Sequence, residues 1–332
     1  MPPSPDAAKR AALVYNPIKV DEKSLRALVE KESAAAGWGA PHFFETTVDD
    51  SGQGVTGEAV AAGAAAVLVA GGDGTVRAVA EALTGTSVPL TIVPSGTGNL
   101  LARNLSLPLS GPAPMVRATF EGDHHHIDVG IAGLQRADGT REEHAFVVMG
   151  GMGMDAAMIA NTNSDLKKRL GWIAYVDGAA RSLLTNKPFR IIYQVAGQKL
   201  RTARVQSVLF ANCGSLPAGL TLIPEASLAD GQLDVAVVQP KGLFGWVLVW
   251  RRVAWLNSAL RRILPAREVH ALRTQDTSIL YSRGTSVDIS PEAAQPVQLD
   301  GDEFGEAVAI HCRVEKDALV IAVPPGHDVS QV

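Results

Sequence analysis

Five consecutive residues have the composition of a phosphate-binding turn: Gly71-Gly72-Asp73-Gly74-Thr75. They follow an apolar run and precede a run with helical spacing. Because glycine has no Cβ, backbone N–H groups in such a turn can converge on an anion, and the helix that begins there adds its own amides. Asp73 would repel a phosphate, so its presence implies a Mg²⁺ ion between the two groups. The alternative is a plain strand-to-helix turn, for which one glycine would suffice.

A second turn has the same design. Pro94-Ser95-Gly96-Thr97-Gly98-Asn99 follows the next apolar run and opens the next helical run. Parallel strands bring their carboxyl ends to one edge of a sheet, where open α/β folds bind their ligands. The sequence therefore predicts that both turns lie at one edge and bind the phosphates of one ligand.

Two other patterns suggest binding sites but favour different interpretations. Gly52-Gln53-Gly54-Val55-Thr56-Gly57 satisfies the dinucleotide pattern G-x-G-x-x-G, but the expected crossover helix after it is too short for that role. His124-His125-His126 suggests a metal cluster. Consecutive residues of an extended chain point in alternate directions, so we expect a polar turn before a strand instead. The chain contains no Walker-type G-x-x-x-x-G-K-[ST] loop.

Alternating strand-type and helix-type runs fill the first 120 residues. This alternation predicts a parallel α/β sheet with right-handed crossovers, the scaffold that would place both turns at one edge. The expected strands are 11–15, 42–45, 64–70 and 88–93, and the expected helices are 21–33, 55–62, 75–83 and one that follows the second turn through 104.

The pattern changes after Pro108, where strands of alternating polarity are separated by turns. This indicates a mainly antiparallel β domain. The expected strands are 127–131, 143–149, 189–195, 204–212, 233–238 and 277–282, with helical excursions near 165–184 and 243–264. Residues 108–114 are the expected linker. The predicted domains are 1–120, 121–325 and a tail, 326–332, that could return to the first domain.

Charge and composition exclude several classes of protein. The formal net charge of −4 argues against a dedicated nucleic-acid binder, which needs a basic surface. Cys213 and Cys312 are the only cysteines, so a disulfide framework is excluded and a reduced, cytoplasmic setting is expected. We expect neither an export signal nor a membrane-spanning helix, because no apolar run is long enough.

Residues 243–264 form an amphipathic helical pattern, with Trp246 on the apolar face and Arg251 and Arg252 opposite. A basic amphipathic helix with tryptophans is typical of a segment that lies in a membrane interface. It is equally typical of a helix packed on a β domain with a solvated arginine face. The sequence leaves both interpretations open.

Seven motifs, in order along most of the chain, resemble the diacylglycerol kinase catalytic-domain family of lipid kinases, which includes the sphingosine kinases. The resemblance implies an ATP-binding α/β domain like that of NAD kinases, joined to a β-sandwich domain. It implies an ATP-dependent lipid kinase that acts on diacylglycerol, a sphingoid base or another lipid alcohol at a membrane surface. The motifs are Asn16-Pro17, Gly71 to Thr75, Pro94 to Asn99, Ile127-Asp128-Val129-Gly130, Gly151-Met152-Gly153-Met154-Asp155-Ala156, Ile223-Pro224-Glu225-Ala226 with Asp230-Gly231-Gln232-Leu233-Asp234, and Leu299-Asp300-Gly301.

The resemblance also implies roles for single residues. Asp302 would be the general base that accepts the proton of the lipid hydroxyl, with Asp73 as its rival. The Asp230 carboxylate, with the backbone carbonyls of Ser227 and Gln232, would bind a second, structural Mg²⁺. The residues expected to hold ATP and its Mg²⁺ are Asn16, Thr46, Gly71, Gly72, Asp73, Gly74, Thr75, Gly96 and Thr97.

Two positions depart from the family's pattern. Leu100 stands where the family often has Asp, and Asp302 stands where it usually has Glu, with Glu303 directly behind. The departures leave open whether Asp302, Glu303 or Asp73 is the base, and they make an inactive nucleotide- or membrane-binding module conceivable. NAD kinases share the Gly71–Thr75 turn, but that family carries an Asn-Glu pair, which does not occur in this chain.

Overall fold

The computed structural model describes residues 9–96, 98–153, 187–214, 223, 225–240 and 278–329. The chain divides into two compact units. The first contains Met1–Val129, Leu228–Asp230 and Glu315–Val332, and the second contains Gly130–Ser227 and Gly231–Val314. The strands β5 (Asp123–Gln135) and β16 (Ala309–Val323) each run from one unit into the other.

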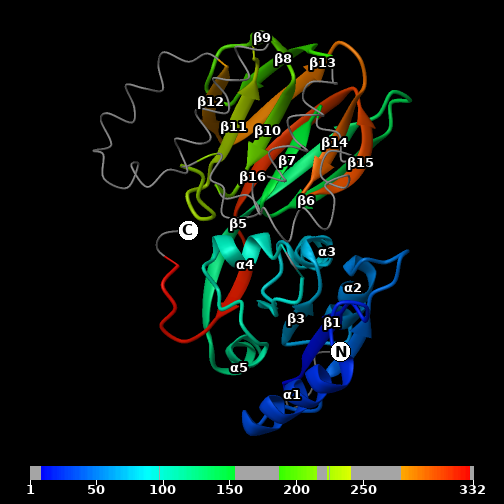
Figure 1. Ribbon diagram of the computed structural model, residues 1–332, viewed down its shortest axis with the longest axis vertical. Helices are drawn as coiled ribbons and strands as arrows, with labels where there is room; N and C mark the ends of the chain where they lie inside the picture. The colour runs from blue at the N-terminus through cyan, green and yellow to red at the C-terminus, as the bar shows by residue number, and fades with distance from the viewer. Residues whose placement is uncertain are drawn as a thin grey trace, which may run out of the picture. The chain divides into compact units, whose positions relative to one another are not determined.

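The first unit is built on a parallel sheet (Figure 1). Its strands are β1 (Ala11–Tyr15), β2 (His42–Glu45), β3 (Ala66–Ala70) and β4 (Leu90–Ile92), in the spatial order β2-β1-β3-β4. Every residue of β1 and β3 is buried. Uninterrupted apolar runs of this kind are typical of parallel strands that are covered on both faces.

Five helices accompany this sheet: α1 (Glu22–Ala35), α2 (Gln53–Ala61), α3 (Asp73–Leu83), α4 (Leu100–Asn104) and α5 (Ala113–Glu121). Helix α1 packs against α5, and α2 packs against α3. The chain leaves β1 for β2 on one side and later places β3 on the other side of β1. The strand order therefore reverses between β1 and β3, which is where ligands bind in doubly wound sheets.

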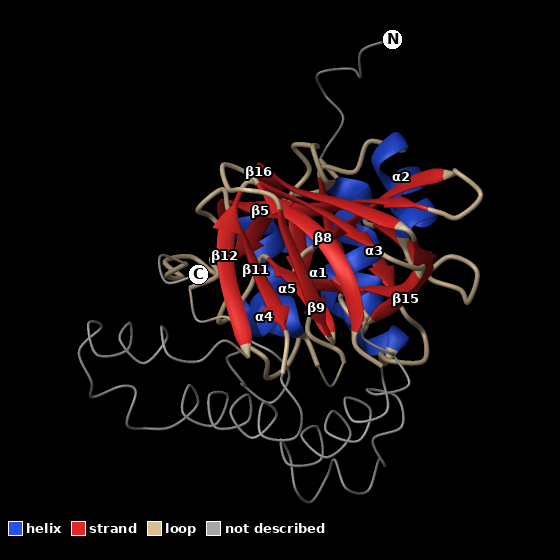
Figure 2. Ribbon diagram, turned by 90° about the horizontal axis from the view of Figure 1, so that it is seen from above, coloured by secondary structure: helices blue, strands red, loops and turns tan. Residues whose placement is uncertain are grey.

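Among the described residues of the second unit, all regular secondary structure is strand. Figure 2 draws the strands of the molecule in red. One antiparallel sheet has the order β12-β11-β10-β7-β14-β15. A second set pairs β9 with β8, β8 with β13, and β13 with β16, all antiparallel. The bounds are β6 (Arg141–Phe146), β7 (Met149–Met152), β8 (Phe189–Val195), β9 (Arg201–Val205), β10 (Ser207–Ala211), β11 (Leu233–Val238), β12 (Ile279–Gly284), β13 (Ser286–Pro291), β14 (Gln295–Leu299) and β15 (Asp302–Ala307).

Side chains from both sets of strands fill one apolar core. Phe146 and Phe210 belong to it, with ring centroids 5.3 Å apart, and Val287 and Leu299 are fully buried in the same core. The predicted fold class, a parallel α/β domain followed by an antiparallel β domain, is confirmed.

Several local predictions were wrong. His124, His125 and His126 do not form a turn before a strand, because β5 already begins at Asp123. Pairing with β16 extends β5 beyond its apolar residues, and the ring Nδ1 of His126 lies 3.2 Å from the Asp317 carbonyl oxygen. Residues 108–114 connect α4 to α5 within the first unit and are not a linker between units.

Two predicted strands are each divided in two. The run 143–149 is split between β6 and β7, and the run 204–212 between β9 and β10. Strands β13 to β16 were not predicted at all. The predicted helical segments 165–184 and 243–264 lie outside the described residues.

Candidate active site

Backbone hydrogen bonds bring the ends of three parallel strands together. Tyr15, the last residue of β1, pairs with Glu45 of β2 and with Ala70 of β3. One residue further on, the Asn16 N–H donates to the Ala70 carbonyl (2.9 Å), and the Thr46 N–H donates to the Tyr15 carbonyl (2.9 Å). Asn16, Thr46 and the turn that begins at Gly71 therefore share one edge of the first unit.

The second glycine turn packs directly against the first. A Cβ atom added to Gly96 would lie 3.1 Å from the Gly72 Cα and 3.3 Å from the Gly71 carbonyl oxygen. A Cβ atom added to Gly98 would lie 2.1 Å from the Oδ2 of Asp73, and the Leu100 N–H donates to the Oδ1 of Asp73 (2.6 Å). The predicted meeting of the two turns is thus confirmed. Glycine at 96 allows the two backbones to approach closely, and glycine at 98 leaves room for the Asp73 side chain.

Asn99 holds the second turn in shape, a role that the sequence analysis missed. Its backbone lies in the left-handed region at φ 48°, and its side chain is buried. The amide Nδ2 donates to the Gly96 carbonyl (2.5 Å), and the Oδ1 accepts the Gly96 N–H (3.2 Å). The signal in the sequence is an Asn directly before a helix, because Asn adopts this conformation more readily than most residues. Thr97 lies outside the described residues.

Helix α3 begins at Asp73 and not at Thr75 as predicted, because the Val76 N–H already donates to the Gly72 carbonyl (3.0 Å). The first N–H groups of an α-helix have no partner within the helix. The turn therefore presents the first amides of α3 at the same edge as the second turn. Thr75 is buried beneath this turn, with its side chain against Gly71.

The surroundings of Asp73 fit a magnesium–nucleotide complex. Its Oδ1 is fixed by the Leu100 amide, and its Oδ2 lies beside Gly98, where the missing Cβ leaves room. Carboxylate oxygens are preferred ligands of Mg²⁺, which usually completes its shell with water and substrate phosphates. Among the described residues, no group of three or more His, Cys, Asp or Glu side chains is arranged to hold a metal ion. Asp73 would therefore share the ion with the nucleotide and water.

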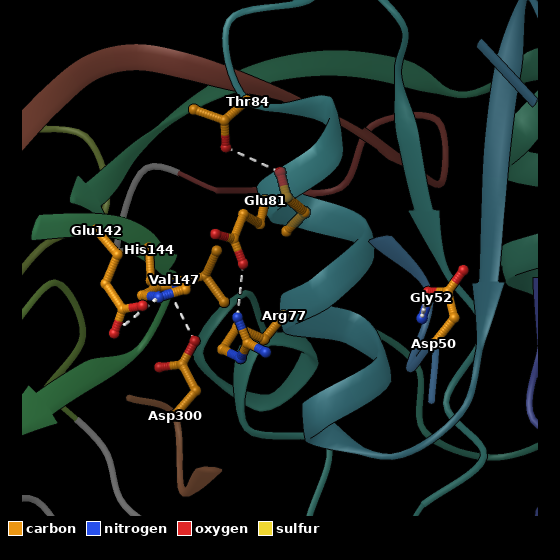
Figure 3. A network of polar contacts seen from close by, with 10 residues as sticks. Asp50, Gly52, Arg77, Glu81, Thr84, Glu142, His144, Val147 and Asp300 are labelled. Atoms are coloured by element: carbon orange, nitrogen blue, oxygen red, sulfur yellow. Dashed lines mark hydrogen bonds and ion pairs between the residues drawn. The ribbon is translucent and has the colours of Figure 1, made fainter. Parts of the chain in front are cut away.

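The dinucleotide-like pattern at Gly52 has a structural explanation. The Asp50 carboxylate accepts the N–H groups of Gly52 (2.9 Å), Gly54 (3.1 Å) and Val55 (2.9 Å) at the start of α2; Figure 3 shows the bond to Gly52. A Cβ atom on Gly54 would lie 2.6 Å from the Asp50 Oδ2. Burial alone would raise the pKa of Asp50, but these N–H groups outweigh it and hold the pKa below its ordinary value. The chain's own carboxylate thus occupies the place that a pyrophosphate would need.

The second unit contains the predicted base at a tight hairpin. Asp300 (φ 51°) and Gly301 (φ 93°) form the two-residue turn between β14 and β15, and Asp302 is the first residue of β15. Asp302 lies opposite Leu299, and Glu303 lies opposite Gln298. Because side chains alternate along a strand, Asp302 and Glu303 point to opposite faces of the sheet.

Asp300 anchors this hairpin, a second role that the sequence analysis missed. Its buried carboxylate accepts three successive backbone N–H groups, from Val147 (2.7 Å), Val148 (2.9 Å) and Met149 (2.9 Å); Figure 3 shows the first of these bonds. Three amides turned toward one carboxylate cannot continue a strand ladder, which explains the break between β6 and β7. Asp302 belongs to the second unit and both glycine turns to the first, so its role as base stays a prediction.

The loop that contains the predicted site of the structural cation is bonded to the first unit at Leu228. Leu228 is buried, and its carbonyl accepts the Asp128 N–H (2.6 Å). Asp230 is exposed on the same loop, and Ser227 and Gln232 are half-buried. One carboxylate and two carbonyl groups are suitable oxygen donors for a hard cation. The role of these three residues stays a prediction.

Comparisons with known proteins agree with these observations. Residues 10–132 match the model of the diacylglycerol kinase catalytic domain, and residues 147–323 match the YegS C-terminal NAD kinase beta sandwich-like domain. The chain is 33% identical over 189 residues to a diacylglycerol kinase of Mycobacterium tuberculosis; this match covers 54% of the chain and only 57% of the length of that relative. It is 29% identical over 278 residues to a Pseudomonas fluorescens protein named "Probable lipid kinase YegS-like", covering 82% and 88% of the two chains.

Solved structures support the fold. A diacylglycerol kinase from Bacillus anthracis superposes with a TM-score of 0.67 at 19% identity and covers 97% of this chain and 99% of its own. Yeast NADH kinase superposes with a TM-score of 0.51 at 10% identity and covers 95% of this chain and 83% of its own. No helix among the described residues combines the length and the apolar character needed to cross a membrane.

Proposed function

Because the chain belongs to the family of lipid kinases that join a diacylglycerol kinase catalytic domain to a YegS-type C-terminal domain, we propose that it transfers the γ-phosphate of ATP to the hydroxyl of a lipid alcohol such as diacylglycerol. The lipid would be met at a membrane surface, since diacylglycerol resides in a bilayer. The main observation in support is the contact between the two glycine turns, with Asp73 fixed between them by the Leu100 amide.

Phosphoryl transfer depends chiefly on positioning the phosphates and stabilising their charge. Bound Mg-ATP would supply the phosphoryl group and the cation. Asn16, Thr46 and the Gly71–Thr75 turn converge on the edge where its phosphates would bind, together with Gly96. Asp73 would hold the cation through its Oδ2. Asp302 would accept the proton of the lipid hydroxyl, as a general base must.

The test is transfer of ³²P from [γ-³²P]ATP to lipids in mixed micelles, with diacylglycerol, sphingosine and NAD supplied as alternative acceptors. We expect a labelled lipid, and we expect Asp73→Asn to lower turnover by about 10²-fold or more, because it removes the charge that holds the cation. Asp138→Asn, on the exposed hairpin between β5 and β6, is the control and should leave turnover unchanged. Labelling of NAD instead of lipid, or near-normal turnover in Asp73→Asn, would contradict the proposal.

A further inference from the structure

None of the described residues assigned to the nucleotide site so far carries a positive charge. Asn16, Thr46 and the glycines are neutral, and Asp73 is negative. A nucleoside triphosphate carries several negative charges, and one magnesium ion neutralises only two of them. Phosphoryl-transfer sites usually add Arg or Lys side chains that stabilise the phosphate charge. The sequence motifs indicated no such side chain.

Arg103 is attached to the second turn. Its Nε donates to the carbonyl oxygen of Gly98 (2.6 Å), the same residue that lies against the Oδ2 of Asp73. This single bond uses one of the five N–H donors of the guanidinium group. Arg103 and Asp73, which we expect to hold the magnesium ion, therefore both contact Gly98.

Arg103 is also available to an anion. Its side chain is exposed, and within the described ranges no carboxylate lies at ion-pairing distance from it. Arg77 on α3 is different, because it is buried and its Nη1 lies 2.7 Å from the Glu81 Oε2 (Figure 3). Leu100, which stands where the family often has Asp, gives Arg103 no acidic neighbour three residues earlier on α4.

We propose that Arg103 binds a phosphate group of the nucleotide and so contributes positive charge to this site. The inference rests on the proposed function and names a binding residue that the family resemblance did not supply. A guanidinium group held through its Nε can present its two remaining nitrogens to the oxygens of one phosphate, a geometry that lysine cannot reproduce.

The test compares Arg103→Gln, Arg103→Lys and the matched control Arg117→Gln. The glutamine amide can still donate to the Gly98 carbonyl, so Arg103→Gln removes the charge and can keep the contact with the turn. Arg117 is exposed on α5, away from both turns, so its substitution removes an equal charge elsewhere. The dissociation constant of Mg-ATP is measured by isothermal titration calorimetry at low and high salt, and KM is measured for ATP and for diacylglycerol.

We expect Arg103→Gln to weaken Mg-ATP binding by about 10-fold to 100-fold, the effect of losing a charge-assisted hydrogen bond. KM for ATP should rise while KM for diacylglycerol stays constant, and the salt dependence of binding should become shallower. Arg103→Lys should bind ATP with intermediate affinity, and Arg117→Gln should behave as wild type.

The possible outcomes distinguish a failure of the Arg103 proposal from a failure of the proposed function. If Arg103→Gln binds Mg-ATP with the same dissociation constant and the same salt dependence as wild type, the role of Arg103 is overturned. The proposed function would remain intact. Equal losses in Arg103→Gln and Arg103→Lys with unchanged salt dependence would mean that the charge of Arg103 does not act on the nucleotide, and would also overturn its role. Wild-type protein that binds no ATP would refute the proposed function, and the inference with it.

Discussion

The two neighbouring acids at the start of β15, Asp302 and Glu303, point to opposite faces of the sheet. Asp302 lies on the face of the sheet that carries Leu299, and Glu303 lies on the opposite face, across from Gln298. Exchanging their positions would require a one-residue slip of the hairpin. The Asp300–Gly301 turn and three N–H bonds to Asp300 oppose such a slip. Glu303 therefore cannot replace Asp302 by a change of rotamer alone.

Asp302 is the expected general base. Asp302→Asn should lower kcat by about 10² to 10⁴-fold and leave the affinity for ATP unchanged, because a base acts on the hydroxyl and not on the nucleotide. Glu303→Gln is the matched control and should retain turnover. Steady-state kinetics with diacylglycerol micelles, combined with ATP titrations, measure both quantities. Loss of turnover in Glu303→Gln but not in Asp302→Asn would move the base by one residue, and full turnover in both would favour Asp73.

At the scale of single elements, α2 shows how a carboxylate organises the start of a helix. Asp50 accepts three N–H groups in the segment where α2 begins, and the low pKa that follows favours its charged form. Substituting Asp50 by Ala leaves these donors without their acceptor. The expected loss is about 1 kcal/mol of stability, the usual cost of removing a helix cap.

The sign of the pH dependence follows from the direction of the shift. A carboxylate whose folded pKa lies below its ordinary value of 3.8 stabilises the fold above that pH and loses this contribution as the pH falls through the folded pKa. Asp50→Ala should therefore melt below wild type at pH 7, and the difference should shrink at pH values under 3.8. Asp49→Ala, at an exposed position next to it, should melt like wild type at both pH values. A constant difference across this range would contradict the role of the charge.

Elements whose identity depends on local sequence were predictable. Two local features predicted the edge of a parallel α/β sheet. They are the buried apolar runs of β1 and β3 and the glycine turns that follow β3 and β4. Elements that depend on distant partners were not. β5 extends over three histidines because β16 pairs with it, and the strand predicted over 143–149 is broken by Asp300, more than 150 residues away along the chain.

The residues of the candidate site also fall into those that the local sequence indicates and those whose role depends on the fold. The motif types indicated Asp73 and the glycines, whereas the contacts of Arg103 with Gly98, and of Asn99 with Gly96, depend on how the turn is folded. The same motif, Leu299-Asp300-Gly301, contained Asp300 without showing that its carboxylate would accept three amides. Side chains that bind backbone groups of their own loop carry little periodic signal in a sequence.

At the scale of the whole molecule, the chain passes repeatedly between the two units. β5 and β16 each cross from one to the other, and the short segment Leu228–Asp230 belongs to the first unit while its neighbours on both sides belong to the second. Leu228 anchors this segment through the Asp128 N–H. A cation bound in the same loop would stabilise a stretch of chain that neither unit holds by regular secondary structure.

The stability of the entire protein should depend on a cation bound at this loop. An ion that binds the folded chain and not the unfolded one stabilises it by mass action, by about 2.7 kcal/mol at a concentration of 100 times its dissociation constant. EDTA should therefore lower the melting temperature of the nucleotide-free wild type, and added Mg²⁺ should restore it. Asp230→Ala should melt at the lower temperature with or without Mg²⁺, yet still bind Mg-ATP, because both glycine turns are intact. Asp73→Asn should show the reverse pattern, with a normal response of the melting temperature to Mg²⁺ and impaired turnover. If Asp230→Ala lost ATP binding but kept the wild-type melting curve and its response to Mg²⁺, the ion at Asp230 would belong to the nucleotide site and would not be structural.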